Sequence, residues 1–293
     1  MKQPLLCVVW SDSRKGGVFL FFKRMAALGM ALALLFSTTL AETFDVLLIG
    51  VDAAADGQRG RSDTMMLARV EPQSGAVRLV SFLRDLYVPI PGHGRTRLNA
   101  AYFYGGEELL AQTLGKNFGV LPDRTVTVDF AVLRDLVDEL GGIELEITEA
   151  ERTHLNRLLE ESGQAQEKLS ASGLQRLSGA QALMYSRIRK LDSDFQRTSR
   201  QQAVIAALLR EMSRFSRWDL FKLAVKNLGR VKTDLSISDL TTLAPLFGKL
   251  QEMEIQTAHV PFEGTFTEET VNGMMVLMPD LGRNQAKLEA FFK

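Results

Sequence analysis

Three apolar runs that follow one another closely predict strands of a central sheet. The first, Asp45 to Val51, is nearly continuous in its apolar character, which is typical of an inner strand covered on both faces. Two further runs, Thr64 to Val70 and Val77 to Leu83, are separated by Glu71-Pro72-Gln73-Ser74-Gly75. A spacer with an early proline and a late glycine predicts a hairpin turn between these two strands.

Strand and helix patterns alternate along the rest of the chain. This alternation predicts an α/β fold, a single three-layer α/β/α domain with a mixed central sheet. The expected helices are Glu107 to Phe118, Phe130 to Leu140, Gly179 to Arg187 with Ser178 as N-cap, one from Asp194, Ser216 to Val231, Ser236 to Gln251 and Leu281 to Phe292. The expected strands are Thr125 to Phe130, Ile143 to Ile147, Glu254 to Pro261, and a hairpin from Phe266 to Leu277 around Asn272-Gly273.

Two stretches are predicted to lack regular structure. Pro89 to Arg97 is rich in proline and glycine and reads as a loop, with His93 as a solvated turn residue. Thr153 to Ser172 is polar and reads as a surface excursion or a substrate-gating loop. Neither stretch predicts chemistry by itself.

The N-terminal part predicts a membrane segment. Met25 to Ala41 carries no charge and follows Lys23 and Arg24, so the positive-inside rule places the N-terminus in the cytoplasm and the rest outside. Residues 1–24 are then a cytoplasmic segment, residues 25–41 an anchor and residues 44–293 an extracytoplasmic domain. A cleaved signal is the alternative, because Thr39-Leu40-Ala41 resembles a signal-peptidase site.

Composition excludes several classes of function. The 35 basic residues balance the 35 acidic ones, which disfavours a general nucleic-acid binder because that class needs a basic face. Cys7 is the single cysteine, so the chain forms no internal disulfide. With only three histidines, far apart, a zinc site has almost no ligands.

Two carboxylates are predicted to converge at one edge of the sheet. Asp52 follows the first strand and Asp63 begins the second, so adjacent strands bring them together. Ligands of open α/β sheets bind beyond the carboxyl ends of strands, and paired carboxylates without soft ligands suit Mg²⁺. The alternative is structural, with Asp52 capping a turn and Asp63 pairing with Arg61.

A cationic cluster forms a second candidate site. The sequence has a local surplus of three positive charges in Arg187, Arg189, Lys190, Arg197 and Arg200 against Asp192 and Asp194. Arg197, Arg200 and Gln201 fall at i, i+3 and i+4 of the helix expected from Asp194, so they share one face. Guanidinium groups at a helix N-terminus favour a phosphate or pyrophosphate ligand. A solvated charged face is the alternative.

Seven ordered motifs then resemble one family. They are LLIGVD, GRSDT, S-x-x-RD, LNAAY-x-YGG, VDF-x-x-x-x-x-LVD-x-LGG, LSG-x-QAL-x-Y-x-R-x-R and D-x-x-RT-x-RQQ, between Phe44 and about Val204. The chain resembles the LytR-CpsA-Psr family over this range. The resemblance implies a membrane-anchored, Mg²⁺-dependent phosphotransferase that moves a glycopolymer from a polyprenyl pyrophosphate carrier to a cell-wall acceptor.

The resemblance also assigns roles to individual residues. It implies that Asp52 and Asp63 hold Mg²⁺, and that Arg84, Asp194 and Arg197 form the catalytic set. The pyrophosphate-binding residues that it implies are Arg84, Arg97, Arg187, Arg189, Arg197 and Gln201. Asp194 is a candidate general base, with the orientation of Arg197 as its alternative role.

Two departures from the family pattern concern the geometry of the substrate. Phe82-Leu83 stands where the family usually has Ile-Pro, and Arg97 replaces a common Lys. A polyprenyl chain needs an apolar trough, whose candidates are also ordinary core residues: Phe103, Phe118, Phe130, Leu133, Leu136 and Val137. A polyprenyl pyrophosphate hydrolase and a non-catalytic lipid-binding regulator remain the alternative functions.

Overall fold

The computed structural model describes residues 43–51, 60–71, 74–188, 194–227, 229–236, 238–239, 243 and 254–293. The chain divides into two units, Met1–Ala41 and Glu42–Lys293, and all the described residues belong to the second. No helix within these described ranges is long and apolar enough to cross a membrane. The expected segment Met25 to Ala41 lies outside them.

A six-stranded mixed sheet forms the centre of the second unit. Its strand order is β10-β3-β2-β1-β6-β9. The strands are β1 (Phe44–Val51), β2 (Ser62–Val70), β3 (Val77–Phe82), β6 (Arg124–Asp129), β9 (Lys232–Thr233) and β10 (Ile255–Val260). β2 pairs antiparallel with β1 and β3, β6 runs parallel to β1, and β10 runs parallel to β3. The predicted inner position of β1 and the β2–β3 hairpin are confirmed.

Both faces of the inner strands are buried because apolar residues occupy successive positions. Leu47 and Ile49 of β1 are fully buried and pack in the largest core cluster. Their neighbour Leu48 packs in a second cluster, together with the fully buried Met66 of β2. Since successive side chains of a strand point to opposite faces, a nearly continuous apolar run needs cover on both sides.

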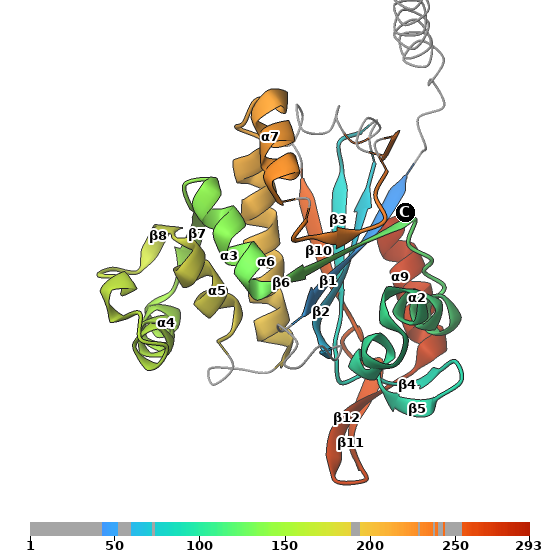
Figure 1. Ribbon diagram of the computed structural model, residues 1–293. Coiled ribbons are helices and arrows are strands. Elements are labelled where there is room, and N and C mark those ends of the chain that lie inside the picture. Colours follow the sequence, from blue (N-terminus) through green and yellow to red (C-terminus); the bar gives the residue numbers. More distant parts are fainter. Residues whose placement is uncertain are drawn as a thin grey trace, which may run out of the picture. The chain divides into compact units, whose positions relative to one another are not determined.

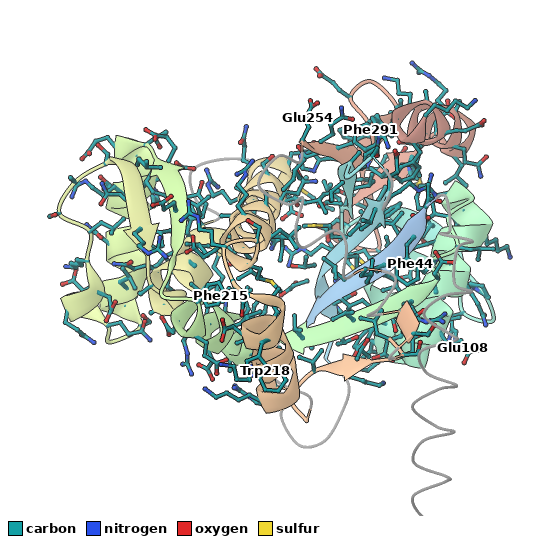
Figure 2. The ribbon with its side chains drawn as sticks, turned by 90° about the horizontal axis from the view of Figure 1, so that it is seen from above. Phe44, Glu108, Phe215, Trp218, Glu254 and Phe291 are labelled. Carbon is teal, nitrogen blue, oxygen red and sulfur yellow. The ribbon has the colours of Figure 1, made fainter. Side chains whose placement is uncertain are left out.

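Helices supply that cover (Figure 1). α2 (Asn99–Phe118) and α9 (Leu281–Phe292) lie on one side of the sheet, and α3 (Phe130–Glu139) and α6 (Asp194–Met212) lie on the other. Figure 2 shows the same division, with Glu108 and Phe291 on one side and Phe215 and Trp218 on the other. The expected mixed α/β fold is confirmed.

α2 begins eight residues before the predicted start at Glu107. The helix is kinked at Gly106, whose φ of 68° and ψ of −152° are not helical. Glycine adopts a positive φ without the steric penalty of a side chain, so the helix can continue through the kink. The two glycines at 105 and 106 break the helical pattern in the sequence, and the part of α2 before them was therefore not predicted. The kink separates a first short segment from the long apolar face that follows.

The stretch Thr153 to Ser172 was wrongly predicted as irregular. Most of it belongs to α4 (Glu149–Glu161) and the 3₁₀ turn η2 (Ala165–Glu167). Thr148 and Glu151 form a capping box that starts α4, a signal readable in the sequence. Around it, β7 (Ile143–Ile147), β8 (Gly173–Leu177) and α5 (Gly179–Ser186) enclose a separate core cluster. The predicted Ser178 cap of α5 is confirmed.

Two hairpins lie below the sheet in Figure 1. The predicted loop Pro89 to Arg97 is wrong, because β4 (Tyr87–Ile90) and β5 (Gly94–Arg97) pair antiparallel there. Gly92 and Gly94 have φ near 75° and 73°, which permits the tight turn between them. The predicted hairpin around Asn272-Gly273 is confirmed as β11 (Phe266–Val271) and β12 (Met274–Pro279).

The C-terminal third returns to the sheet. α7 (Arg217–Asn227) is shorter than the predicted Ser216 to Val231, because the chain turns after Asn227 to add β9 at the edge beside β6. Most of the predicted helix Ser236 to Gln251 lies outside the described residues. β10 and α9 follow as predicted.

Candidate active site

The first part of the site lies where β2 begins and β3 ends. These antiparallel neighbours bring Asp63, the second residue of β2, close to Arg84, two residues beyond β3. Nη1 of Arg84 donates a hydrogen bond to Oδ1 of Asp63 at 2.9 Å. The predicted convergence of Asp63 with Asp52 stays a prediction, because Asp52 lies outside the described residues. The partner of Asp63 that the structure describes is the guanidinium group of Arg84.

α6 brings two more charges to the same edge. Its first residue, Asp194, places Oδ1 3.7 Å from Nη2 of Arg84. One turn on, Arg197 is 3% exposed, and its Nη2 lies 2.9 Å from Oδ2 of Asp194. A carboxylate at a helix N-terminus is favoured by the helix dipole, and this one also fixes a buried guanidinium. Arg84 thus joins β2, β3 and α6 through charged contacts.

A second pair extends the cluster toward the hairpins. Oδ2 of Asp85 lies 3.6 Å from Nε of Arg84, and Oδ1 of Asp85 lies 3.2 Å from Nε of Arg97 at the end of β5. Nη2 of Arg97 also donates to the carbonyl oxygen of Met275 on β12. Asp85, to which the sequence analysis gave no role, therefore sits between two predicted phosphate-binding arginines. Its position directly after Arg84 was the available signal.

Opposite charges are balanced among these six side chains. Asp63, Asp85 and Asp194 carry three negative charges, and Arg84, Arg97 and Arg197 carry three positive ones. Burial alone would lower the pKa of Arg84, but Asp194, Asp63 and Asp85 together raise it above its ordinary value. The guanidinium of Arg84 therefore stays charged at all physiological pH values, as an anion-binding group requires.

Several buried polar atoms at this edge have no hydrogen-bond partner among the residues that the structure describes. The buried atoms without a hydrogen-bond partner include Nε of Arg84, Oδ1 of Asp85, Nε of Arg97, Oδ1 of Asn99 and Oγ of Ser62. Buried polar atoms are normally paired, so a local concentration of exceptions needs an explanation. A polar ligand that hydrogen-bonds at this edge is one explanation.

An apolar cavity of about 50 Å³ lies on the α6 side of the sheet, and its lining includes Thr64, the neighbour of Asp63 on β2. Its lining residues are Leu48, Ile49, Gly50, Thr64, Met66, Val128, Asp129, Phe130, Leu133, Ser186, Gln201, Val204 and Ile205. Gln201, predicted to bind pyrophosphate, is 9% exposed and lies in this lining. The guanidinium of Arg187 lies 4.5 Å from the ring centroid of Phe130, which places that cation beside the cavity.

The trough residues proposed from the sequence divide into two groups. Phe130 and Leu133 line the cavity, whereas Phe118 and Val137 belong to two different core clusters. Leu136 packs against the second of those clusters. Phe103 was wrongly placed among core candidates, because its side chain is 42% exposed.

Arg200 does not join the cationic cluster, contrary to the prediction from its spacing. Its Nε donates to Oε1 of Glu151 on α4 at 2.9 Å, and its Nη1 donates to the carbonyl oxygen of Ile188. Burial would raise the pKa of Glu151, but Arg200 and the Thr148 cap lower it below its ordinary value. Arg200 therefore ties α6 to α4, and its role is structural.

Two predicted site residues, Asp52 and Arg189, lie outside the described residues. Among the described residues, no group of three or more His, Cys, Asp or Glu side chains is arranged to hold a metal ion. Asp63 is the one predicted metal ligand that the structure describes, and it faces the edge where Arg84 and Asp194 lie.

Comparisons with known proteins identify the family of the chain. A family model described as the LytR_cpsA_psr family matches residues 32–291. The chain is 34% identical over 261 residues to a polyisoprenyl-teichoic acid–peptidoglycan teichoic acid transferase, TagU, of Enterococcus faecalis, covering 85% of this chain and 79% of that protein. It is 31% identical over 231 residues to the regulatory protein MsrR of Staphylococcus aureus, covering 78% and 67%.

Solved structures show the same fold. The structure described as TagT bound to LIIa-WTA superposes with a TM-score of 0.72 at 25% identity, and the match covers 86% of this chain and 90% of that one. A crystal structure of Bacillus subtilis TagT superposes with a TM-score of 0.70, also at 25% identity, and covers 86% and 91%.

Proposed function

The chain belongs to the LytR-CpsA-Psr family, and from this membership and the geometry of the site we propose that it is a glycopolymer phosphotransferase. It would move a glycopolymer from a polyprenyl pyrophosphate carrier to a sugar hydroxyl of the cell wall, with peptidoglycan as acceptor. One observation carries the proposal: Arg84 is flanked by Arg97 and Arg197 through shared carboxylates, and Thr64, the neighbour of its partner Asp63, lines an apolar cavity of about 50 Å³. A lipid pyrophosphate has a matching anionic head and apolar chain.

The relatives support the same reading by their names. TagU is named as a transferase of teichoic acid from a polyisoprenyl carrier to peptidoglycan, and TagT has been solved bound to LIIa-WTA. MsrR is named as a regulatory protein, so regulation without catalysis is the second candidate. The charge-balanced arginines, of which Arg197 is buried, suit the charge stabilisation that phosphoryl transfer needs, so we place catalysis first.

The reaction exchanges one phosphorus–oxygen bond for another. The acceptor hydroxyl oxygen attacks the phosphorus that bears the glycopolymer, and the bond from that phosphorus to the bridging oxygen breaks. The bridging oxygen leaves with the polyprenyl phosphate, which takes up the proton that the acceptor hydroxyl loses. The product is a phosphodiester between the two glycans. In such displacements the enzyme contributes mainly positioning and charge stabilisation.

The arginines would supply that charge stabilisation. Arg84 and Arg197 would donate to the non-bridging oxygens, and Arg97 and Arg187 would approach the pyrophosphate from the hairpin side and the cavity side. Asp194 accepts from Arg197 at 2.9 Å, an arrangement that suits orientation of Arg197 better than proton abstraction. Asp85 holds both Arg84 and Arg97 and would keep their forks directed at the same ligand.

Mg²⁺ is the proposed cofactor, with Asp63 and Asp52 as its protein ligands. Magnesium sites commonly use one or two carboxylates and complete their coordination with water and substrate phosphates, so two aspartates suffice. The bound ion would neutralise charge on the pyrophosphate. We expect Mg²⁺ to raise the melting temperature of the full-length protein in the presence of pyrophosphate, and Asp63→Asn to abolish that shift.

The location follows from the same proposal. Residues 25–41 would anchor the chain in the cytoplasmic membrane, with residues 1–24 inside and residues 44–293 outside, where the acceptor is found. The excess of basic residues before Met25 supports this orientation. Protease protection of the N-terminus in sealed vesicles would test it.

The decisive experiment uses full-length protein, a radiolabelled synthetic glycosyl polyprenyl pyrophosphate and Mg²⁺, with and without uncrosslinked glycan strands. We expect label on the glycan strands with wild type and a large loss with Arg187→Ala. Free glycosyl phosphate released at the same rate with or without acceptor would favour the hydrolase. If neither product forms while the lipid still binds, the regulatory candidate replaces the transferase.

A further inference from the structure

An exposed aromatic surface lies beside the arginine cluster. Phe103 and Tyr104 of α2 are 42% and 45% exposed, and their ring centroids lie 5.7 Å apart at an edge-on angle of 66°. His93, from the turn of the β4–β5 hairpin, stacks on Tyr104 with centroids 4.3 Å apart and planes 6° from parallel. We call these three residues the aromatic platform.

The backbone around the platform holds its rings in place. Gly92 and Gly94 flank His93 with positive φ and form the turn that holds its ring against Tyr104. Gly106 ends the first segment of α2 directly after these rings. Large apolar side chains exposed to water forgo hydrophobic stabilisation, so an adjacent pair held in place by a third ring suggests a binding surface.

Two elements link the platform to the anion-binding site. The backbone N–H of Asn99, at the start of α2, donates to the carbonyl oxygen of Arg84 at 3.3 Å. Phe103 follows Asn99 by four residues, so it lies about one turn further along the same helix face. The second element is the β4–β5 hairpin, which carries His93 in its turn and Arg97 at the other end of β5.

The position of the platform relative to the apolar cavity indicates which substrate binds there. The apolar cavity proposed for the lipid lies between the sheet and the α3 and α6 side, whereas α2 and the β4–β5 hairpin lie on the other side (Figure 1). In phosphoryl transfer, the attacking and leaving oxygens are roughly in line across the phosphorus. If the lipid phosphate leaves toward the cavity, the acceptor hydroxyl must arrive from the side of the platform.

The chemistry of the platform suits a sugar. The face of an aromatic ring carries negative charge, so it attracts the polarised C–H bonds that line one face of a pyranose ring. Resting on the proposed transferase function, we propose that Phe103, Tyr104 and His93 form the acceptor subsite and stack against sugar rings of the cell-wall glycan. The glycan would thereby hold its hydroxyl in line with the phosphorus near Arg84.

The test measures the KM values for acceptor and donor in full-length variants. The platform variants are Tyr104→Ala, Phe103→Ala and Tyr104→Phe. The matched control is Trp218→Ala, which removes another exposed aromatic ring, on α7. Loss of one stacked ring should raise the KM for glycan strands about tenfold. The KM for the lipid donor should stay within about twofold. Tyr104→Phe keeps the ring and should behave as wild type, as should Trp218→Ala.

Three outcomes would overturn the inference. The first is an unchanged acceptor KM in Phe103→Ala and Tyr104→Ala. The second is a rise in the donor KM in place of the acceptor KM, which would assign the platform to the donor glycan. The third is an equal rise of the acceptor KM in Trp218→Ala. Binding of chitotetraose by calorimetry gives a readout that needs no turnover. If wild type binds chitotetraose and both alanine variants do not, the platform stands even where the transferase assay fails. Absence of binding to wild type in that case would remove the platform as well.

Discussion

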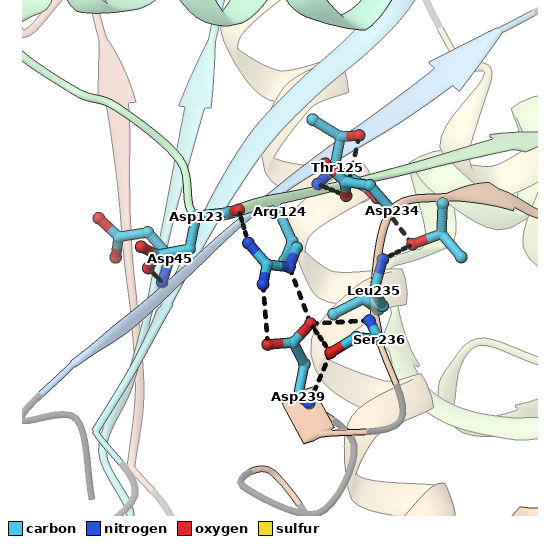
Figure 3. A network of polar contacts seen from close by, with 9 residues as sticks. Asp45, Asp123, Arg124, Thr125, Asp234, Leu235, Ser236 and Asp239 are labelled. Carbon is cyan, nitrogen blue, oxygen red and sulfur yellow. Dashed lines mark hydrogen bonds and ion pairs between the residues drawn. The ribbon is translucent and has the colours of Figure 1, made fainter. Parts of the chain in front are cut away.

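Two arginine–aspartate clusters, at opposite ends of the sheet, differ in how fully their hydrogen bonds are made. Near the start of β6, Arg124 donates to both oxygens of Asp239 at 2.8 and 3.2 Å and to the carbonyl oxygen of Asp123 at 2.7 Å (Figure 3). Near the start of β2, Arg84 makes one hydrogen bond to the described residues, with Asp63, and its other two ion pairs with them are 3.6 and 3.7 Å long.

This difference indicates that the Arg124 cluster is a structural ion pair and that the Arg84 cluster is a binding site. The Arg124 network also fixes the loop after β9, since the backbone N–H and hydroxyl of Ser236 both donate to Asp239 (Figure 3). In the Arg84 cluster, by contrast, the buried Nε of Arg84 has no hydrogen-bond partner within the part of the chain that the structure describes. Guanidinium N–H groups that lie near carboxylates without donating hydrogen bonds to them can donate to a phosphate oxygen at little energetic cost.

The largest expected effect is on catalysis at Arg84. Arg84→Ala should lower the transfer rate about 100- to 1,000-fold, because one preorganised charged donor contributes about that much to transition-state stabilisation. Arg84→Lys should restore little, since a point charge cannot replace the fork shared by Asp63, Asp85 and Asp194. Rates should be measured on folded protein, with melting temperatures recorded alongside.

Arg124→Ala is the matched control at the other end of the sheet. It should leave the transfer rate within about twofold of wild type and lower the melting temperature instead. If both alanine variants lost activity equally, or if Arg84→Ala lost stability alone, the contrast between the two clusters would be wrong.

Part of the Arg84 cluster follows from the sequence because strand ends are local features. Asp63 and Arg84 stand at the boundaries of apolar runs, and antiparallel neighbours bring such boundaries together. Asp194 and Arg197 are joined by helical spacing, which is also readable from the order of residues. These four residues lie together in the structure, while their catalytic and binding roles remain predictions.

Partners that are distant in the sequence could not be predicted in this way. Arg200 shares a helix with Arg197 but pairs with Glu151, 49 residues away, on a helix that the sequence analysis had missed. His93 and Tyr104 meet only because a hairpin, wrongly predicted as a loop, folds over α2. In both cases tertiary packing, which local spacing does not encode, decides the contact.

The buried pair of Asp45 and Arg69 is a second structural ion pair, and its effect should be seen in the stability of the fold. Asp45 is buried, and it accepts two hydrogen bonds from Arg69 at 2.8 and 2.6 Å. Asp45→Ala should destabilise the fold by about 2 kcal/mol, because it leaves the guanidinium half-buried without its carboxylate. That corresponds to a roughly 30-fold change in the unfolding equilibrium, measurable by urea denaturation.

The double variant Asp45→Leu, Arg69→Met tests the reason for that loss. Replacing both members of an ion pair by apolar groups is often close to neutral, so this variant should recover most of the stability. Its transfer rate on folded protein should equal that of wild type. A double variant as unstable as Asp45→Ala would show that packing, and not the unpaired charge, accounts for the loss.

The smallest expected effect is the pH dependence of the Arg124 network. The Ser236 hydroxyl, followed by Arg124, lowers the pKa of Asp239 from 3.8 to about 2 despite partial burial. A carboxyl group whose pKa is lower in the folded state stabilises the fold above its unfolded pKa and loses that contribution as the pH falls. Wild type should therefore exceed Asp239→Asn in melting temperature above about pH 4, and this difference should shrink between about pH 4 and pH 2. A difference independent of pH would mean that Asp239 acts through hydrogen bonds that its neutral amide replacement disrupts equally, and the ionic account of this cluster would fail while the account of Arg84 would stand.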